Sequence, residues 1–203
     1  MPASAPPPLP PGEIHLWFFP QWERARDAAD SAPLRRLLAA YLDRPVETIR
    51  IERGAHGKPR IADAQLQFNL SHAADALLLG ISRNSVLGVD IEPAARTVSA
   101  PLELAQRFFA LREAAALAAL PEPARQAAFL RLWCAKEAVL KAHGQGIGFG
   151  LERFEFVVDS AGMSIPATGN PWRICEVIPA LALVGALAYR EPVSHLRAFV
   201  ANS

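Results

Sequence analysis

The chain has 203 residues and a hydrophobic content of 51%, which is ample for the core of one large domain or of two small domains packed together. Its formal net charge of +1 leaves no basic surplus, so we expect no nucleic acid as a partner. The two cysteines, Cys134 and Cys175, are too few for a disulfide framework and fit a reducing cytoplasm.

The first part of the chain has α+β character. Residues 1–12 are rich in proline and lack the basic and apolar regions of a secretory signal, so we expect a flexible lead-in. Residues 13–19 alternate well enough for a strand, and residues 32–42 have the apolar spacing of a helix. The remaining predicted elements are a strand at 48–53, a loop at 54–60, a strand at 66–72 and, within 75–92, two apolar strands joined by a turn at 83–85.

The second part of the chain again pairs helices with strands. Residues 101–120 are predicted as one helix, and a long helix follows from about residue 124 to residue 143, where Gly144 ends it. Strands are predicted at 154–159, 172–179, 180–189 and 196–201. The longest apolar run, 178–189, is well short of the roughly 20 residues that span a bilayer, so we expect no membrane association. We therefore predict an α+β fold of two halves, residues 13–95 and 96–203, after the lead-in at 1–12.

One predicted strand, "SVLGVDIEP" at residues 85–93, carries two acids. Because side chains alternate along a strand, Asp90 and Glu92 point to the same face, roughly 6.5 to 7 Å apart. If both are ionised, they repel by about 2 to 3 kcal/mol at an effective dielectric of about 20. Two explanations stay open: bulk solvent at the end of an edge strand, or a hard divalent cation such as Mg²⁺.

Other polar groups have ordinary structural explanations when each is taken alone. In "WCAKEAVLK", Glu137 and Lys141 lie one turn apart on one helix face, as in a solvent-exposed ion pair worth about 0.3 to 0.5 kcal/mol. "RGAHGKP" at 53–59 suits an anion site or a surface turn equally well. "FNLSH" at 68–72 ends a strand with a hydroxyl and an imidazole, which can bind phosphate or cap a turn. "HGQGIGFG" at 143–150 lacks the spacing of a dinucleotide or P-loop fingerprint and is treated as a helix stop.

Taken in order, these segments resemble a known family. "GKPR", "FNLSH", "LGVDIE", "RFFALRE" and "WCAKEAVLKAHGQGIG" resemble the motif series of the surfactin-type 4′-phosphopantetheinyl transferases, over roughly half of the chain. The most specific are "GVDIE" and "WCAKEAVLK", which is similar to the family's W-x-x-K-E-A-x-x-K helix. The resemblance implies a Mg²⁺-dependent enzyme that moves the 4′-phosphopantetheine arm of coenzyme A to a serine of an apo acyl or peptidyl carrier protein and releases adenosine 3′,5′-bisphosphate. It also implies a pseudo-twofold pair of similar halves with coenzyme A between them, in a chain that is a monomer.

The resemblance further implies roles for individual residues. The Mg²⁺ ligands would be Asp90, Glu92 and Glu137, and Glu137 would also be the general base. Lys141 would contact the pyrophosphate and stabilise the leaving phosphate, whereas Lys136 would have a structural or charge-supporting role. Asp90 and Lys141 would also belong to the coenzyme site, whose adenine and 3′-phosphate end would be recognised by Arg53, His56, Gly57, Lys58, Ser71 and His72.

One segment departs from the family's pattern. The basic helical segment that usually precedes the first helix looks shortened to "FPQWERARDAADSAP" at 19–33, where Arg24 or Arg26 would have to replace a phosphate-binding cation.

The docking side for an acidic carrier protein would include Arg107 and Arg112. The alternatives are a non-catalytic coenzyme A-binding relative and an unrelated Mg²⁺-dependent phosphohydrolase.

Overall fold

The computed structural model describes residues 5–22, 28–29, 31–62, 65–158, 164–166 and 169–201. The helices in these ranges are α1 Ala32–Leu42, α2 Pro101–Phe108, α3 Leu111–Ala119 and α4 Glu122–His143, with short 3-10 turns η1 Val46–Thr48, η2 Ile147–Phe149 and η3 Leu151–Arg153. The strands are β1 Glu13–Phe19, β2 Ile51–Arg53, β3 Pro59–Ile61, β4 Gln67–Ala73, β5 Ala76–Ser82, β6 Leu87–Pro93, β7 Phe156–Val158, β8 Ser164–Pro166, β9 Arg173–Val177, β10 Leu183–Tyr189 and β11 His195–Val200.

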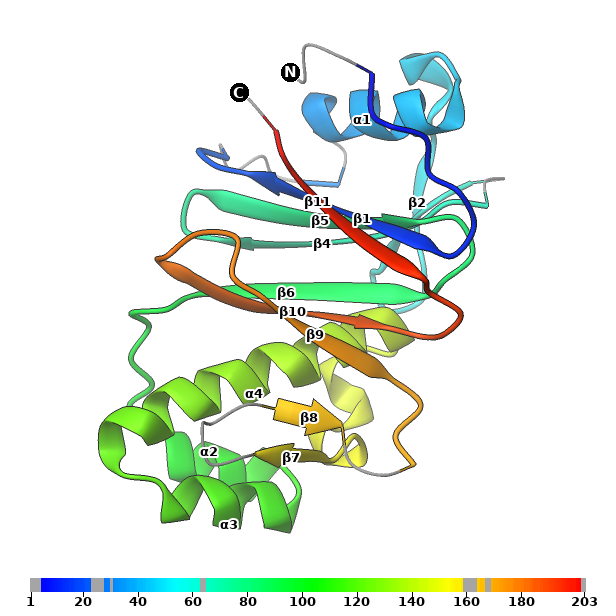
Figure 1. Cartoon of the computed structure of the whole chain (residues 1–203). Helices are drawn as coiled ribbons and strands as arrows, with labels where there is room; N and C mark the ends of the chain where they lie inside the picture. Colours follow the sequence, from blue (N-terminus) through cyan, green and yellow to red (C-terminus); the bar gives the residue numbers. More distant parts are fainter. Residues whose placement is uncertain are drawn as a thin grey trace.

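The fold is mixed α+β and is built around two larger sheets. One is four-stranded in the order β11-β1-β5-β4, and the other is three-stranded in the order β6-β10-β9. Only the pairing of β1 with β11 is parallel among the described strand pairs. Figure 1 shows the two sheets stacked in the middle of the molecule, with α1 above them and α4 below them. The sheets β2-β3 and β7-β8 are small hairpins beside these layers.

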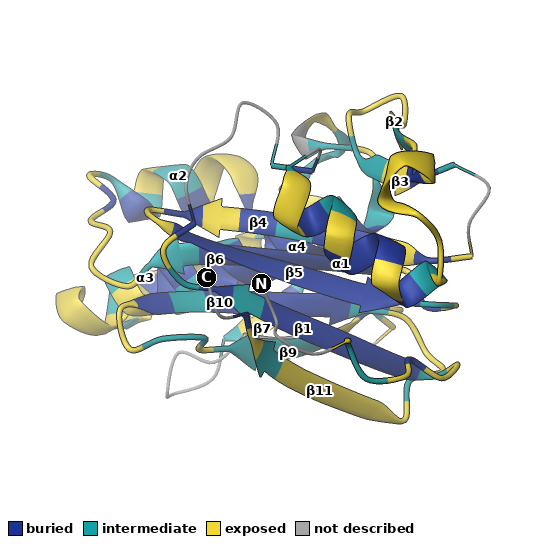
Figure 2. Ribbon diagram, turned by 90° about the horizontal axis from the view of Figure 1, so that it is seen from above, coloured by how far each residue is buried: buried dark blue, intermediate teal, exposed yellow. Residues whose placement is uncertain are grey.

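The alternation of side chains along the strands places apolar layers on both faces of the four-stranded sheet. All seven residues of β5 are buried, because Leu77 and Leu79 pack into the cluster below α1 while Leu78 packs between the two sheets. Seen from above, α1 exposes its outer face and covers buried strands (Figure 2). The core therefore consists of successive layers rather than one central cluster.

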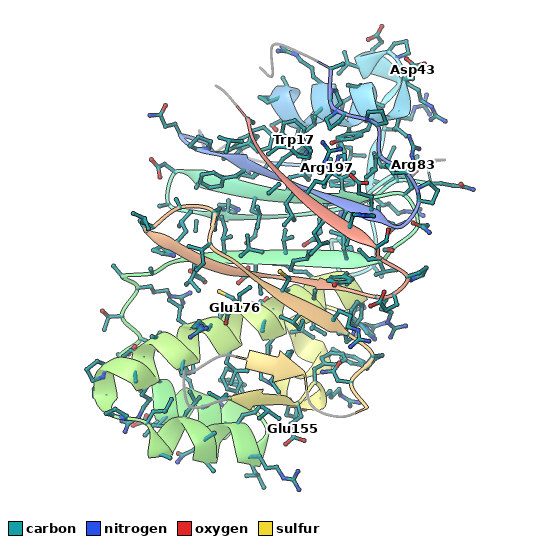
Figure 3. The ribbon with its side chains drawn as sticks, viewed as in Figure 1. Trp17, Asp43, Arg83, Glu155, Glu176 and Arg197 are labelled. Carbon is teal, nitrogen blue, oxygen red and sulfur yellow. The ribbon has the colours of Figure 1, made fainter. Side chains whose placement is uncertain are left out.

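The third layer lies between α4 and the three-stranded sheet, where helix and strand approach closely. A Cβ atom at Gly88 of β6 would overlap the carbonyl oxygen of Ala138 and the amide nitrogen of Ala142, both on α4. At the other edge of this sheet, Arg131 of α4 donates two bonds of 2.8 Å to the carboxylate of Glu176 on β9, which Figure 3 labels beside α4. These contacts fix α4 against β6 and β9.

A buried polar chain joins β1 to α1 and to β11. The indole of Trp17 donates to the hydroxyl of Tyr41 at 2.8 Å, and that hydroxyl lies 2.6 Å from Nδ1 of His15. Nε2 of His15 lies 2.7 Å from Oε1 of Glu13, which Arg197 of β11 approaches at 3.6 Å. Because the carboxylate of Glu13 can only accept, Nε2–H of His15 donates to it, and Nδ1 of the neutral ring then accepts from the hydroxyl of Tyr41. Figure 3 labels Trp17 and Arg197 on this sheet.

Several predicted elements are confirmed, and others differ. Strand 13–19 and helix 32–42 have the predicted bounds. The strand predicted at 48–53 begins only at Ile51, because Thr48 belongs to the 3-10 turn η1. The single helix predicted at 101–120 is wrong: the chain becomes extended at Phe109 and Ala110, where the buried Phe109 ring stacks on Phe129 at 5.4 Å. The long helix begins at Glu122 instead of residue 124, because proline is compatible with the first turn of a helix. The predicted loop at 54–60 overlaps β3, which pairs with β2 in a hairpin.

Both large sheets contain strands from either side of residue 95. β11 pairs with β1, and β6 pairs with β10. The division into 13–95 and 96–203 stays a prediction. In the predicted lead-in, Leu9 is buried and its carbonyl accepts from Arg83 at 2.8 Å. Both cysteines are free thiols, and none of the described helices has the length and apolar content to cross a membrane.

Candidate active site

The site is built where the edge strand β6 meets β4 of the other sheet. Side chains of β4 make the hydrogen bonds to β6 that a neighbouring backbone would otherwise make. Oδ1 of Asn69 accepts from the amide of Val89 at 2.8 Å, and Oγ of Ser71 accepts from the amide of Ile91 at 3.3 Å. The "FNLSH" segment therefore joins the two sheets, in addition to any contact that it makes with a ligand.

Asp90 is held by two side chains and retains one unused oxygen. Its Oδ1 accepts from Oγ of Ser71 at 2.9 Å and from Nζ of Lys141 at 2.7 Å. Nζ of Lys141 also donates to Oγ of Ser71 at 2.9 Å. Asp90 is 5% exposed, and its Oδ2 is buried without a hydrogen-bond partner among the described residues. An unpaired buried carboxylate oxygen is costly unless a ligand or ion satisfies it.

Two glutamates complete the acidic cluster. Burial raises the pKa of Glu137, the carboxylates of Asp90 and Glu92 raise it further, and Lys141 opposes the shift. Burial also raises the pKa of Glu92, against the effect of Arg96, with which Glu92 forms an ion pair. The negative charge of Asp90 thus raises the pKa of both glutamates, and that of Glu92 also raises the pKa of Glu137.

An open cavity of about 450 Å³ contains this cluster. Its lining includes the predicted residues Ser71, His72, Asp90, Glu92, Glu137 and Lys141, together with Trp133 and Arg96. In the described part of the chain, no group of three or more His, Cys, Asp or Glu side chains is disposed to hold a metal ion as it stands. The cations of Arg96 and Lys141 lie on the carboxylates instead.

A second cavity, of about 470 Å³, adjoins the first. Leu70, His72, Glu137 and Lys141 line both cavities. The predicted residues Arg53, His56, Gly57 and Lys58 line only the second, which also receives Trp22 and Asn69. The structure thus brings every predicted site residue to one of two adjoining cavities. Arg24 and Arg26 lie outside the described residues.

The hairpin at one wall of the second cavity is held by internal bonds and by α4. Nη1 of Arg53 donates to the carbonyl of Gly57 at 2.8 Å, and Gly57 has a φ of 80°, a left-handed conformation that suits glycine. Nζ of Lys58 donates to the carbonyls of Ala142, at 2.9 Å, and Leu87, at 3.2 Å. Burial lowers the pKa of Lys58 to about 8.

Lys136 also lies on α4, beside Glu137, but it lines neither cavity and has a structural role. It is fully buried and forms a 2.7 Å ion pair with the equally buried Glu113. Its Nζ also donates to the carbonyls of Leu151, at 2.9 Å, and Phe154, at 2.8 Å. Burial lowers the pKa of Lys136, and the ion pair with Glu113 counteracts that effect. The pair attaches α3 and the segment after α4 to the helix that carries Glu137.

Sequence reasoning missed Asn69 and Arg96 as members of the site. Asn69 had a usable signal: it is polar, it alternates with the apolar Phe68 and Leu70, and it lies two residues before Ser71 and therefore shares that residue's face. Arg96 had none, because its partner Glu92 belongs to a strand and the i,i+4 spacing has no fixed geometry beyond a strand end.

The fold and the site define a mixed α+β protein with an acid and lysine cluster between two ligand-sized cavities. Comparison with known proteins agrees with this description. The model of the 4′-phosphopantetheinyl transferase superfamily matches residues 86–177, which include Asp90, Glu92, Glu137 and Lys141. Among curated relatives, the 4′-phosphopantetheinyl transferase HetI of Nostoc sp. is 34% identical over 176 residues, covering 85% of this chain and 73% of HetI.

Two further relatives share less of their length with the chain. The 4′-phosphopantetheinyl transferase psf-1 of Bacillus pumilus is 34% identical over 122 residues, covering 60% of this chain and 51% of psf-1. The human L-aminoadipate-semialdehyde dehydrogenase-phosphopantetheinyl transferase is 31% identical over 160 residues, covering 71% of this chain and 52% of that protein. The chain thus spans about half the length of these two relatives. It belongs to the 4′-phosphopantetheinyl transferase superfamily.

Proposed function

We propose that the chain transfers the 4′-phosphopantetheine arm of coenzyme A to a serine hydroxyl of an apo acyl or peptidyl carrier protein and releases adenosine 3′,5′-bisphosphate. The observation that carries this proposal is the junction of two cavities at one acid and lysine cluster, in a chain of this family. A cavity of 470 Å³ has the size of a small-molecule site, and the adjoining cavity leaves the cluster open to a second reactant.

The acidic cluster would hold one Mg²⁺ through Asp90, Glu92 and Glu137. The unpaired Oδ2 of Asp90 and the raised pKa values of Glu92 and Glu137 support this, because a cation would satisfy the first and lower the other two. Bound there, Mg²⁺ would neutralise charge on the pyrophosphate. Arg96 now pairs with Glu92, so that carboxylate would have to leave Arg96 to become a ligand.

Glu137 would act as the general base for the acceptor serine. Its carboxylate lines both cavities, so it can lie within hydrogen-bond reach of an acceptor hydroxyl at the point where the two reactants meet. The serine oxygen would attack the phosphorus atom that carries the pantetheine arm, and its proton would pass to Glu137. The bond between that phosphorus and the oxygen bridging to the adenosine-bearing phosphate would break, so that one phosphoester forms and one phosphoanhydride is lost.

Lys141 would stabilise the departing phosphate. Its ammonium group is already placed by bonds of 2.7 Å to Asp90 and 2.9 Å to Ser71, so little reorganisation is needed when negative charge develops nearby. The coenzyme's adenine and 3′-phosphate would lie in the 470 Å³ cavity, whose wall includes Arg53 and His56. His72, which also lines this cavity, would bind the 3′-phosphate.

Three finer points belong to the same proposal. The two halves would be related by a pseudo-twofold axis, since each large sheet has one helix, α1 or α4, on its outer face (Figure 1). The acidic carrier would dock near the exposed Arg107, Phe108 and Arg112. The enzyme would be a monomer, because both cavities are lined from one chain, and would work in the cytoplasm, where free thiols such as Cys134 and Cys175 persist.

The experiment is incubation with coenzyme A, Mg²⁺ and a panel of apo-carrier proteins, followed by mass measurement of each carrier. A phosphopantetheine mass on a carrier serine is the expected result. Coenzyme A binding without transfer would favour the non-catalytic relative, and nucleotide turnover without any carrier would favour a phosphohydrolase. Transfer that is unchanged in Asp90→Ala would contradict the catalytic role of the cluster.

A further inference from the structure

The C-terminal end of α4 is capped by a side chain from a distant hairpin. The last carbonyls of a helix have no partner within the helix, and a cation near them is favourable. Nζ of Lys58 donates to one such carbonyl, that of Ala142, and also to the carbonyl of Leu87, the first residue of β6. Lys58 lies in the turn between β2 and β3, so this one ammonium group joins a hairpin, a strand and a helix.

The hairpin lies at ordinary van der Waals distance from the backbone that follows α4. A Cβ at Gly144, the C-cap of α4, would lie 3.5 Å from Cδ of Lys58, and one at Gly146 would lie 3.7 Å from Cβ of His56. The amide of Gly54 donates to the carbonyl of Lys58 at 2.9 Å, which closes the turn. The hairpin and the end of α4 thus pack together along one wall of the 470 Å³ cavity.

We propose that Lys58 is a positioning residue, which fastens the β2–β3 hairpin to the end of α4 and thereby sets the shape of the coenzyme cavity. The inference rests on the proposed function and deepens it, because it links the end of the site that binds adenosine to the helix that carries the catalytic groups. A cation that bound the coenzyme's 3′-phosphate directly would instead have to leave both carbonyls.

The two roles differ in how the enzyme treats 3′-dephospho-coenzyme A. If Lys58 only positions the hairpin, Lys58→Met raises KM for coenzyme A and for 3′-dephospho-coenzyme A by the same factor, about tenfold for the loss of a charge-assisted hydrogen bond. The value of kcat stays within about twofold, because bound coenzyme A at saturation holds the cavity wall in the same position as in the wild type. Lys58→Arg, which keeps a cationic donor, recovers most of the loss. His72→Ala serves as the contrast, because the loss of a phosphate ligand reduces the preference for coenzyme A over its dephospho form.

Amide hydrogen exchange tests whether Lys58 holds the β2–β3 hairpin against α4, and this measurement does not depend on catalysis. In Lys58→Met, amides of residues 51–61 and 142–146 should exchange faster than in the wild type. The matched control is Arg60→Met, which removes a cation from the same hairpin, but one whose partner Glu52 is exposed and whose side chain is itself 69% exposed. It should change neither exchange nor KM.

The outcomes separate this inference from the proposed function. If Lys58→Met abolishes the preference for coenzyme A over the dephospho form while exchange is unchanged, Lys58 is a phosphate ligand and the inference is wrong. If the wild type binds coenzyme A in calorimetry but modifies no carrier, the transferase proposal fails, whereas the exchange data still decide whether Lys58 holds the hairpin.

Discussion

The buried carboxylate of Glu137 lowers the stability of the folded protein as the pH rises. Its pKa is raised by burial and by Asp90 and Glu92, so the ionised form is disfavoured in the folded protein. Below the ordinary value of 4.5, the group is protonated in both folded and unfolded chains and has no effect. As the pH rises from 4.5 through the folded-state pKa, the unfolded chain is already ionised while the folded protein still holds its proton. The free energy of unfolding therefore falls over this range.

Glu137→Gln should therefore stabilise the metal-free protein near neutral pH while nearly abolishing transfer. We expect the gain to grow as the pH rises from 4.5 through the folded-state pKa of Glu137, because the uncharged amide does not have to lose a proton. Thermal unfolding in EDTA between pH 4 and pH 8 measures it, and the difference from the wild type should vanish at the acid end. Added Mg²⁺ should raise the Tm of the wild type and not that of the variant. A variant that is less stable at every pH would show that Glu137 contributes structural bonds instead.

Lys141 is proposed to act on the departing phosphate, whereas the metal would be bound by the carboxylates. Lys141→Ala should lower kcat by about 10² to 10³, as expected when one preorganised donor to a developing charge is removed. Divalent cation affinity should be unchanged or higher, because a cation that now bonds Asp90 at 2.7 Å is gone. Single-turnover rates and Mn²⁺ titration measure the two effects independently. An unchanged rate would reduce Lys141 to a residue that orients Asp90.

At the scale of the element, the site depends on how closely α4 approaches β6. Gly88→Ala places a methyl group against the backbone of α4 at Ala138 and Ala142, where no flexible side-chain end can give way. We expect a loss of about 1 to 3 kcal/mol in the free energy of unfolding, and a fall in transfer because the helix carrying Glu137 and Lys141 is displaced from Asp90. Urea unfolding and the carrier assay measure both. The control is Gly148→Ala, since a Cβ at Gly148 would have no atom within 4 Å and should change neither quantity.

The elements themselves were largely predictable, but their partners were not. Helical spacing placed Glu137 and Lys141 on one face of α4, as the structure confirms through their shared cavities. The same spacing suggested an ion pair between them, whereas Lys141 bonds to Asp90, 51 residues away in sequence. Periodicity reports which residues share a face and gives no information on which strand will cover it. The carbonyl partners of Lys58 were unpredictable for the same reason, because every residue carries a carbonyl and only the fold selects two of them.

The two ends of the chain are interlocked at the scale of the whole molecule. β11 completes the sheet that begins with β1, and β10 pairs with β6 over seven residues. The apolar layer between the sheets mixes both parts of the chain, with Ile14, Leu78 and Val89 from the first and Leu183 and Leu187 from the second. The parts on either side of residue 95 thus share two sheets and one core layer.

We therefore expect that fragments 1–95 and 96–203 do not fold alone. The first would expose the edge of β1 that β11 covers and the edge of β6 that β10 covers, and the second would leave β11 without β1 and β10 without β6. Proton–nitrogen correlation spectra should show little dispersion for either fragment, and mixing them should restore dispersion, since the shared layer needs both. A chain with a cleavage site inserted between residues 95 and 96, cut after folding, is the control and should keep native spectra. Cooperative unfolding of the isolated first fragment would show instead that its strands and α1 form an independent unit, and that β11 and β10 dock onto it only afterwards.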